Sequence, residues 1–338
     1  MEPQSPNQTT PENFLEEDVH IENRELRFNV REIFSNLWNL DWSKVSWGFV
    51  IFCVFLHICF PYGVYLALFS AQWKTLGFAL MLLVMGELGV TMGVHRLWAH
   101  CSFKATFPLR AVLVLFQTIS LQSHIYEWTI NHRVHHKYCE TDADPHNAKR
   151  GLFFSHMGWL MYEKHPEFIS KMHCIDMKDI ENDCLVMWQK KHYLSLALLV
   201  SFIIPTLVPW LCWGEHLLNA VMVPVFLRCI VLYHITWSVN SLAHWIGGKP
   251  YEKNIYPSQN AVVAFFTLGE GWHNYHHVFP WDYKTSEFGG FTNINFTTLI
   301  IKLCSKVGLA YDLKTVAPEV IEKRARRTGD GTYKGPSK

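Results

Sequence analysis

The chain has 338 residues, of which 49% are hydrophobic and only 17% are charged, whereas soluble domains carry about 25% charged residues. These proportions indicate a membrane protein with sizeable parts outside the bilayer, and they exclude a disordered, collagen-like or coiled-coil chain. The net charge of +1 creates no field that would attract nucleic acid, so we expect no nucleic-acid partner. The 19 His residues are an unusual excess, and imidazole is the commonest metal ligand in proteins.

The first 45 residues are polar and acidic. They lack the charged segment and following apolar segment of a secretory signal peptide. We therefore expect residues 1–45 to form a cytosolic N-terminal segment that is partly disordered.

Four segments are apolar over the 20 or so residues that a helix needs to cross a bilayer. Short turns join the first segment to the second and the third to the fourth, which predicts two helical hairpins. The predicted membrane-spanning helices are at about 47–70, 73–94, 193–213 and 217–239. Two shorter apolar stretches, Leu109–Leu121 and Phe296–Leu303, predict interfacial or buried helices.

The distribution of Lys and Arg predicts the orientation, because cytoplasmic loops carry an excess of both. Twelve basic residues lie between the second and third segments, twelve follow the fourth and four precede the first, while the hairpin turns carry only Lys74. We therefore expect a multi-pass protein with both termini in the cytosol. Residues 95–191 and 240–338 would form a cytosolic cap, and residues 46–338 a single domain with the spans.

Three histidine clusters and one further histidine lie near the cytosolic ends of the predicted spans. On a helix, residues at i, i+3 and i+4 share a face, so an HxxHH cluster can direct three imidazoles the same way. Two copies of HxxHH far exceed what the His content would give by chance. The candidate metal ligands are His95, His100, His132, His135, His136, His244, His273, His276 and His277.

Nine imidazoles are too many for one metal, since a zinc ion takes about four ligands. They suit two metals with four or five ligands each. Carboxylates are few near the clusters, which argues against the Glu-rich di-iron site of ferritin-like bundles. Imidazole accepts Zn, Cu, Fe or Ni, and the spacing does not choose among them. We interpret the other histidines, among them His57, His146, His156 and His234, as structural or surface residues.

His95 and His100 do not fit the HxxHH pattern. They are five residues apart, which separates two side chains by about 140° on a regular α-helix. Either the helix ends or distorts between them, or the two histidines bind different metals.

The segments around these histidines resemble the animal stearoyl-CoA-type acyl-CoA desaturases. The resemblance extends from about residue 47 to residue 334, and its motifs are highly specific. The matching segments are His95-Arg-Leu-Trp-Ala-His100, Tyr126-Glu-Trp128, Asp142-Ala-Asp-Pro-His146-Asn, Trp237-Ser-Val-Asn240-Ser-Leu-Ala-His244, Gly269-Glu-Gly-Trp-His273-Asn-Tyr-His-His277 and Arg327-Thr-Gly-Asp-Gly-Thr-Tyr333.

The resemblance implies an all-α membrane protein in which four transmembrane helices in two hairpins carry a helical cytosolic cap with a histidine-rich di-iron site. Two Fe ions (Fe2+/Fe3+) would be the cofactors, with no separate acid or base residue. It implies an endoplasmic reticulum membrane location, O2 as the oxidant, and electrons from cytochrome b5 and its reductase. One iron would bind His95, His100, His132, His136 and His276, and the other His135, His244, His273 and His277, with Asn240 acting through water.

The resemblance also implies an apolar tunnel for the acyl chain beside the metals. Trp128 and Trp237 are candidate wall residues, although core packing explains both equally well. Glu87 lies within the second span, at the position that lines the far end of the tunnel in the family. There it would shorten the tunnel or receive a polar chain end. The alternative is a protonated Glu87 that hydrogen-bonds a neighbouring helix, with Arg228 as one candidate partner.

At the positions that contact the CoA head group in the family, this sequence differs from the usual pattern. It has Ser123 in place of Asn, Ile130 and Asn131 in place of Arg-Asp, and Glu163 before Lys164 in place of Arg-Lys. Two arginines that would bind phosphate or adenine are lost, and Glu163 would repel a phosphate. CoA is then held by other residues, bound weakly, or replaced by another carrier. Our first interpretation is a drifted but functional acyl-CoA site.

These observations make an iron- and O2-dependent acyl-CoA desaturase the leading hypothesis. The alternatives are a related lipid hydroxylase, a desaturase that uses another acyl carrier, and a non-catalytic lipid-binding homologue. A bis-His haem protein would need paired histidines inside its spans, and a zinc hydrolase is disfavoured because the chain has no HExxH. The sequence leaves open the double-bond position and geometry, the chain-length preference and the oligomeric state.

Overall fold

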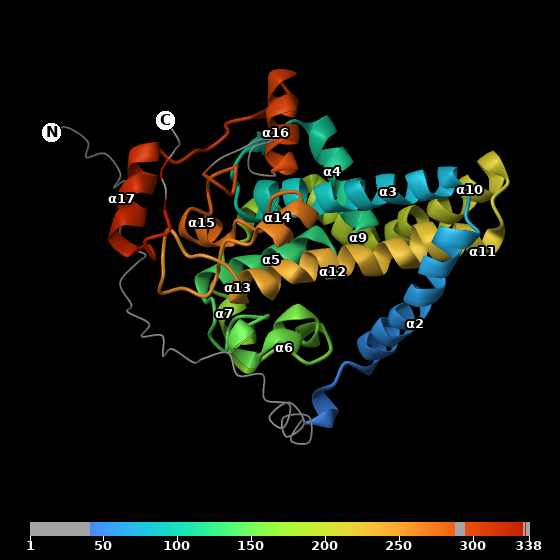
Figure 1. The fold of residues 1–338 in the computed structure, drawn as a ribbon, viewed down its shortest axis with the longest axis horizontal. Helices are drawn as coiled ribbons and strands as arrows, with labels where there is room; N and C mark the ends of the chain where they lie inside the picture. Colours follow the sequence, from blue (N-terminus) through green and yellow to red (C-terminus); the bar gives the residue numbers. More distant parts are fainter. Residues whose placement is uncertain (1–40, 288–294, 334, 336–338) are drawn as a thin grey trace. The chain divides into compact units, whose positions relative to one another are not determined.

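The computed structural model describes residues 41–287, 295–333 and 335. The first 40 residues lie outside this range, and with them most of the predicted N-terminal segment. The described part is mostly helical (Figure 1). Its one small sheet is an antiparallel ribbon of β1 (Lys104–Ala105) and β2 (Ala310–Tyr311), which the sequence did not predict.

Four continuous helices are long and apolar enough to cross a membrane, which confirms the four predicted segments. They are Trp47–Phe69, Trp73–Ala99, Cys184–Trp213 and Leu217–Trp245. Three of them extend beyond the predicted bounds on the cap side, because the helical backbone continues past the last apolar residues into polar sequence. Two of these extensions carry metal-ligand candidates out of the apolar layer.

Each long helix except the first changes geometry along its length. The first is α2 (Trp47–Phe69). The second joins α3 (Trp73–Leu88) to the π-helix η3 (Gly89–Ala99). The third consists of α9 (Cys184–Leu198), η6 (Leu199–Ile203) and α10 (Ile204–Trp213). The fourth consists of α11 (Leu217–Val221), η7 (Met222–Leu227), α12 (Arg228–Asn240) and α13 (Leu242–Trp245).

A single carboxylate joins the turns of the two hairpins. Glu215, between α10 and α11, accepts hydrogen bonds from the N–H of Gln72 at 2.8 Å, the hydroxyl of Thr75 at 2.5 Å and the amide of Asn219 at 2.9 Å. Gly214 ends α10 in the left-handed region at φ +66°, which glycine adopts without strain. The two hairpins are thus joined at the end of the stem that carries no histidine cluster.

The predicted helix at Leu109–Leu121 is present as α4 (Phe107–Ile119). One face is buried, with Leu113 and Val114, and the other exposes Val112 and Leu115. It packs on α3, η3 and α9.

Arg228 is not the partner of Glu87 that the sequence suggested. Its guanidinium donates to the carbonyl oxygens of Pro224 at 2.8 Å and Ile119 at 2.7 Å, and within the described residues it forms no ion pair with Glu87. Ile119 is the last residue of α4, so Arg228 closes a carbonyl that the helix end leaves open. A helix end that is shielded from water needs such an internal partner for its free carbonyl groups.

The remaining elements, apart from the short η2 before the first long helix, form the cap. The longest is α5 (Ile125–Lys137), which packs against η3 and α9. The predicted helix at Phe296–Leu303 is α16 (Phe296–Lys306). The other helices are η2 (Trp42–Lys44), η4 (Ala148–Arg150), α6 (Leu152–His156), η5 (Gly158–Leu160), α7 (Pro166–Met172), α8 (Lys178–Glu181), α14 (Ala261–Phe266), α15 (His273–Val278) and α17 (Pro318–Thr328).

Candidate metal centre

The nine predicted ligands converge from four separate parts of the chain. His95 lies in η3 with His100 directly after it, three histidines lie on α5, His244 lies in α13 and three lie on α15. Their nitrogens form two groups that can each hold a metal ion. The first group is His95, His100, His132, His136 and His276, and the second is His135, His244, His273 and His277.

The π-helix resolves the spacing of His95 and His100. The N–H of His100 donates to the carbonyl oxygen of His95 at 3.1 Å, an i to i+5 hydrogen bond. This bond places the fifth residue almost above the first, and the two ring centroids are only 4.9 Å apart. The helix is therefore distorted and then ends, as one of the two alternatives predicted, and both histidines belong to one group.

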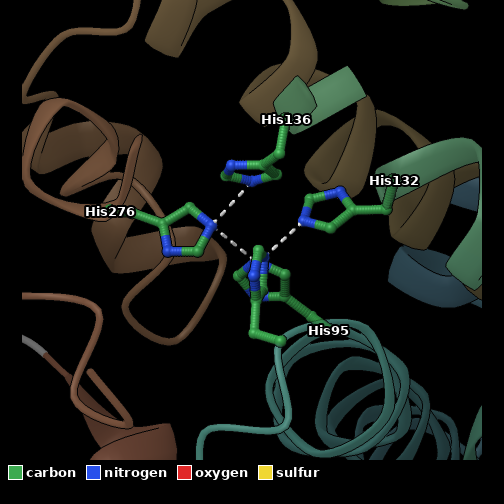
Figure 2. A group of neighbouring side chains, drawn as sticks. His95, His132, His136 and His276 are labelled. Atoms are coloured by element: carbon green, nitrogen blue, oxygen red, sulfur yellow. Dashed lines mark hydrogen bonds between the residues drawn. The ribbon is translucent and has the colours of Figure 1, made fainter. Parts of the chain in front are cut away.

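In the first group the ring nitrogens point at a common centre (Figure 2). His95 Nε2 and His136 Nε2 each lie 3.0 Å from His276 Nε2. His100 Nε2 lies 2.8 Å from His132 Nε2. The five rings come from η3, the residue after it, α5 and α15.

The second group has the same construction with four rings. His273 Nε2 lies 3.0 Å from both His244 Nε2 and His277 Nε2. His135 Nε2 lies 3.3 Å from His277 Nε2.

Carboxylates on the far side of the rings indicate which nitrogens carry protons. His135 Nδ1 lies 2.9 Å from Asp144 Oδ1, and His244 Nδ1 lies 2.7 Å from Glu140 Oε1. A neutral imidazole donates from one nitrogen only, so these two rings donate from Nδ1 and direct the Nε2 lone pair inward. Lone pairs that converge repel one another unless a cation lies between them. Histidines that donate their other ring N–H to a carboxylate are typical of metal sites.

Burial favours the neutral form of seven of these imidazoles, and the neutral form is the one that binds metal. Desolvation, followed by the neighbouring histidines, lowers the pKa of His132 and His136 well below the usual value. The same holds for His100, His135, His273, His276 and His277.

The spacing of the nitrogens fits a metal with several ligands at right angles. With metal–nitrogen bonds of about 2.1 Å, two ligands lie about 3.0 Å apart at 90° and about 3.4 Å apart in a tetrahedron. Three Nε2 pairs of the first group lie 2.8–3.0 Å apart, all of its nitrogens lie within 4.8 Å of one another, and it has five members. These facts favour a metal of higher coordination number over tetrahedral zinc.

Sequence reasoning missed the acidic residues behind the ligands. Glu140 and Asp144 follow the second cluster by four and eight residues, and Glu270 precedes the third by three, so proximity in sequence was the available signal. His146, interpreted as structural or surface, is buried with its ring 4.2 Å from that of His135.

Glu270 joins His95 to a buried arginine. Its Oε2 lies 3.0 Å from His95 Nδ1, and its Oε1 accepts from Arg96 Nε at 3.0 Å. Burial alone would raise the pKa of Glu270, but Arg96 and His95 outweigh it and lower the pKa. A negative Glu270 therefore fixes the His95 ring from behind.

The two candidate tunnel tryptophans lie in different surroundings. Trp128 stacks on the ligand His132 at 4.8 Å between centroids, so it borders the metal centre. Trp237 stacks on Tyr233 at 5.1 Å and belongs to an apolar cluster with Cys53 and Leu56. Asn240 ends α12, one helical turn before His244.

The predicted head-group residues are partly brought together. Lys164 Nζ donates to Asn131 Oδ1 at 2.5 Å. Ile130 instead packs against the apolar cluster that includes Ile125 and Ile180. Ser123 adopts a positive φ of 61°, and its carbonyl accepts from Gln117.

Glu87 lies in α3 and is only 3% exposed. Its Oε1 has no hydrogen-bond partner within the described residues. Oε1 therefore makes no hydrogen bond to a neighbouring helix within these residues, and both interpretations of Glu87 stay predictions.

Three other histidines form a chain outside both groups. His57 Nε2 lies 3.2 Å from His234 Nε2, and His234 Nδ1 lies 2.9 Å from His156 Nε2. The chain ends at the hydroxyl of Ser241, 2.8 Å from His156 Nδ1. It joins α2, α12 and α6, in agreement with the structural interpretation of these residues.

Comparison with known proteins identifies the family. The family model described as fatty acid desaturase matches residues 71–285. The chain is 51% identical to an acyl-CoA Delta-12 desaturase of Tribolium castaneum over 86% of this chain and 81% of the relative. It is 51% identical to an acyl-CoA Delta-9 desaturase of Acheta domesticus, over 86% and 80%.

A human relative extends the comparison beyond insects. The chain is 46% identical to the stearoyl-CoA desaturase of Homo sapiens, over 85% of this chain and 79% of the relative. The family-model match over residues 71–285 includes both histidine groups. The chain therefore belongs to the fatty acid desaturase family.

Proposed function

We propose that this protein is an O2-dependent acyl-CoA desaturase that introduces a double bond into a fatty acyl chain at a centre of two iron ions. The observation that carries the proposal is the convergence of nine histidine nitrogens into groups of five and four. The names of the relatives at 46–51% identity supply the acyl-CoA substrate class.

The proposed reaction explains why such a site is needed. A methylene in an acyl chain has no acidic proton and no leaving group, so side chains alone cannot oxidise it, and a cofactor must supply the oxidising power. Each turnover removes two hydrogen atoms from the chain and takes up two electrons and two protons. It reduces O2 to two waters.

The chain's own residues hold, orient and enclose this chemistry. Asp144, Glu140 and Glu270 orient three ligand rings from behind. Trp128 would form the wall of the acyl tunnel next to the metals, and Trp237 a wall further along. Asn240 would hold a water at the four-histidine group, which lacks a fifth imidazole.

The electrons would come from cytochrome b5 and its reductase. The four apolar helices and the basic cap segments support a multi-pass protein of the endoplasmic reticulum membrane with both termini in the cytosol. The histidine groups would then face the cytosolic reductants.

The CoA head group would lie at Asn131 and Lys164, near Ser123. Lys164 is the cation retained there, and Asn131 holds its ammonium group. Ile130 contributes apolar packing and no charge. The site therefore offers phosphate one fixed cation, which supports an acyl-CoA site that binds the head group more weakly than one with additional arginines.

Expression in a desaturase-deficient yeast, followed by gas chromatography–mass spectrometry of total fatty acids, tests the proposal. A new double bond establishes the reaction and its position. If the purified protein contains iron but forms neither a double bond nor a hydroxyl group in any acyl-CoA pool, acyl-CoA desaturation is refuted and lipids on other carriers become the substrates to examine.

A further inference from the structure

The carboxylates behind the metal ligands connect to different parts of the cap. Asp144 is buried, and its Oδ1 accepts the N–H of His146 at 3.1 Å. Glu270 is closed in by the buried Arg96. Neither connection reaches an exposed side chain directly.

Glu140 provides a short connection to the surface. Its Oε1 lies 2.7 Å from His244 Nδ1, while its Oε2 lies 3.3 Å from the backbone nitrogen of Lys149. The same oxygen accepts the N–H of Ala148 at 2.6 Å. Lys149 is exposed, so one buried carboxylate separates an exposed residue from a metal ligand.

Two ammonium groups lie near one tyrosine ring next to this connection. Lys149 Nζ lies 5.7 Å from the ring centroid of Tyr256, and Lys249 Nζ lies 5.8 Å from it. Within the described residues neither ammonium forms an ion pair. Asp330 accepts the backbone N–H of Lys249, so one carboxylate lies near Lys249. Lys149, Lys249 and Tyr256 are called the Lys149–Lys249 patch below.

We propose that the Lys149–Lys249 patch docks the acidic one-electron carrier protein that reduces the metal centre, and that the electron enters along the link from Lys149 through Glu140 to His244. This inference rests on the proposed function, because each desaturation consumes two electrons delivered by two reduced carrier molecules. Cations on the surface attract an acidic carrier and hold it in one orientation. The aromatic ring near both cations adds the amphipathic contact area that interfaces favour.

The test uses the full-length protein in nanodiscs and the soluble haem domain of cytochrome b5 as the acidic probe. The variant is the double change Lys149→Glu and Lys249→Glu. The matched control is Lys302→Glu with Lys306→Glu, which alters the net charge equally on α16. Neither control lysine has a role in the metal centre.

The first readout is the equilibrium dissociation constant for the haem domain, measured on metal-free protein. The patch variant should raise it about tenfold at low salt, and the difference should shrink at high salt as charges are screened. The control pair should change it less than twofold. Equal weakening by both pairs, or none by the patch pair, would overturn the proposal.

The second readout compares turnover driven by cytochrome b5 with turnover driven by dithionite, which needs no docking surface. The patch variant should lower the ratio of the two rates about tenfold. A patch variant whose only defect is a higher KM for acyl-CoA would show that the cations bind the CoA phosphates, and the docking proposal would fail. If the wild-type chain turns over with neither reductant while its patch still binds the haem domain, the docking surface stands and the proposed reaction is wrong.

Discussion

At the scale of single residues, the five-histidine group depends on each of its members. The variant His136→Ala removes one of the five converging nitrogens of this group. We expect iron content to fall from about two to about one per chain and desaturation to be lost, with the same detergent-solubilised size profile. His173→Ala, at an exposed position outside both groups, should leave both quantities unchanged. Full metal content in His136→Ala would refute the ligand assignment.

Glu270 can be tested apart from the ligands themselves. Glu270→Gln keeps the shape but removes the charge that balances Arg96 and faces His95 Nδ1. Loss of a carboxylate behind a ligand typically weakens metal binding 10- to 100-fold, and we expect a change in that range in a chelator competition. Glu322→Gln, whose exposed carboxylate pairs with Arg326, provides the comparison. Identical chelator curves for the two variants would show that Glu270 does not support the metal.

Glu87 tests the proposed path of the acyl chain. If its side chain closes the far end of the tunnel, Glu87→Ala removes that volume and the accepted chain should lengthen by about two carbons. Glu87→Gln has nearly the same volume and should keep the original product profile. The measurement is the chain-length distribution of products by gas chromatography–mass spectrometry. An unchanged product profile in Glu87→Ala would show that Glu87 does not close the tunnel.

At the scale of elements, the contact between η3 and α4 sets the position of His95. Gly89 begins η3, and a Cβ there would lie 2.2 Å from the backbone nitrogen of Gln117 in α4. Since backbone cannot move as a flexible side chain does, Gly89→Ala must push the two helices apart.

We expect Gly89→Ala to destabilise the protein by about 2–3 kcal/mol and to lower its iron content. Gly77→Ala on the same helix is the matched control, because a Cβ added there would meet no atom within 4 Å. It should be neutral or slightly stabilising. Thermal unfolding in detergent and metal analysis measure both effects. Equal melting temperatures of the two variants would mean that α4 moves to accommodate the methyl group added at residue 89.

The elements show how far the sequence could predict this fold. Four apolar segments were sufficient to predict the two hairpins, and the HxxHH spacing was sufficient to predict the ligands of α5 and α15. Both predictions depend only on local periodicity. The π-helix was not predictable beyond the conflict that His95 and His100 create, since an i to i+5 bond needs tertiary packing to stabilise it. The roles of Arg228 and Glu270 depend on contacts with distant segments, which no local pattern contains.

At the scale of the whole molecule, each metal group combines distant segments. The first takes ligands from η3, α5 and α15, and the second from α5, α13 and α15. These ligands are separated by up to 181 residues along the chain. An unfolded chain cannot assemble such a site, so metal binding should stabilise the entire cap and stem together.

The metal-free protein should therefore lose stability in mild acid. Burial lowers the pKa of seven cluster histidines below the ordinary value of about 6.5. Below that pH the unfolded chain binds more protons than the folded chain, so the free energy of unfolding decreases as the pH falls. We expect the melting temperature of the metal-free protein to be constant between about pH 8 and 7 and to decrease steadily from about pH 6.5 to 5.

The iron-loaded protein provides the comparison for this acid sensitivity. Protons must displace iron before they reach the ring nitrogens, so its melting temperature should begin to fall at a lower pH than that of the metal-free protein. Differential scanning fluorimetry of both forms across the range measures the two curves. Coincident curves would mean that these histidines do not bind the metal, and the ligand assignment would be refuted.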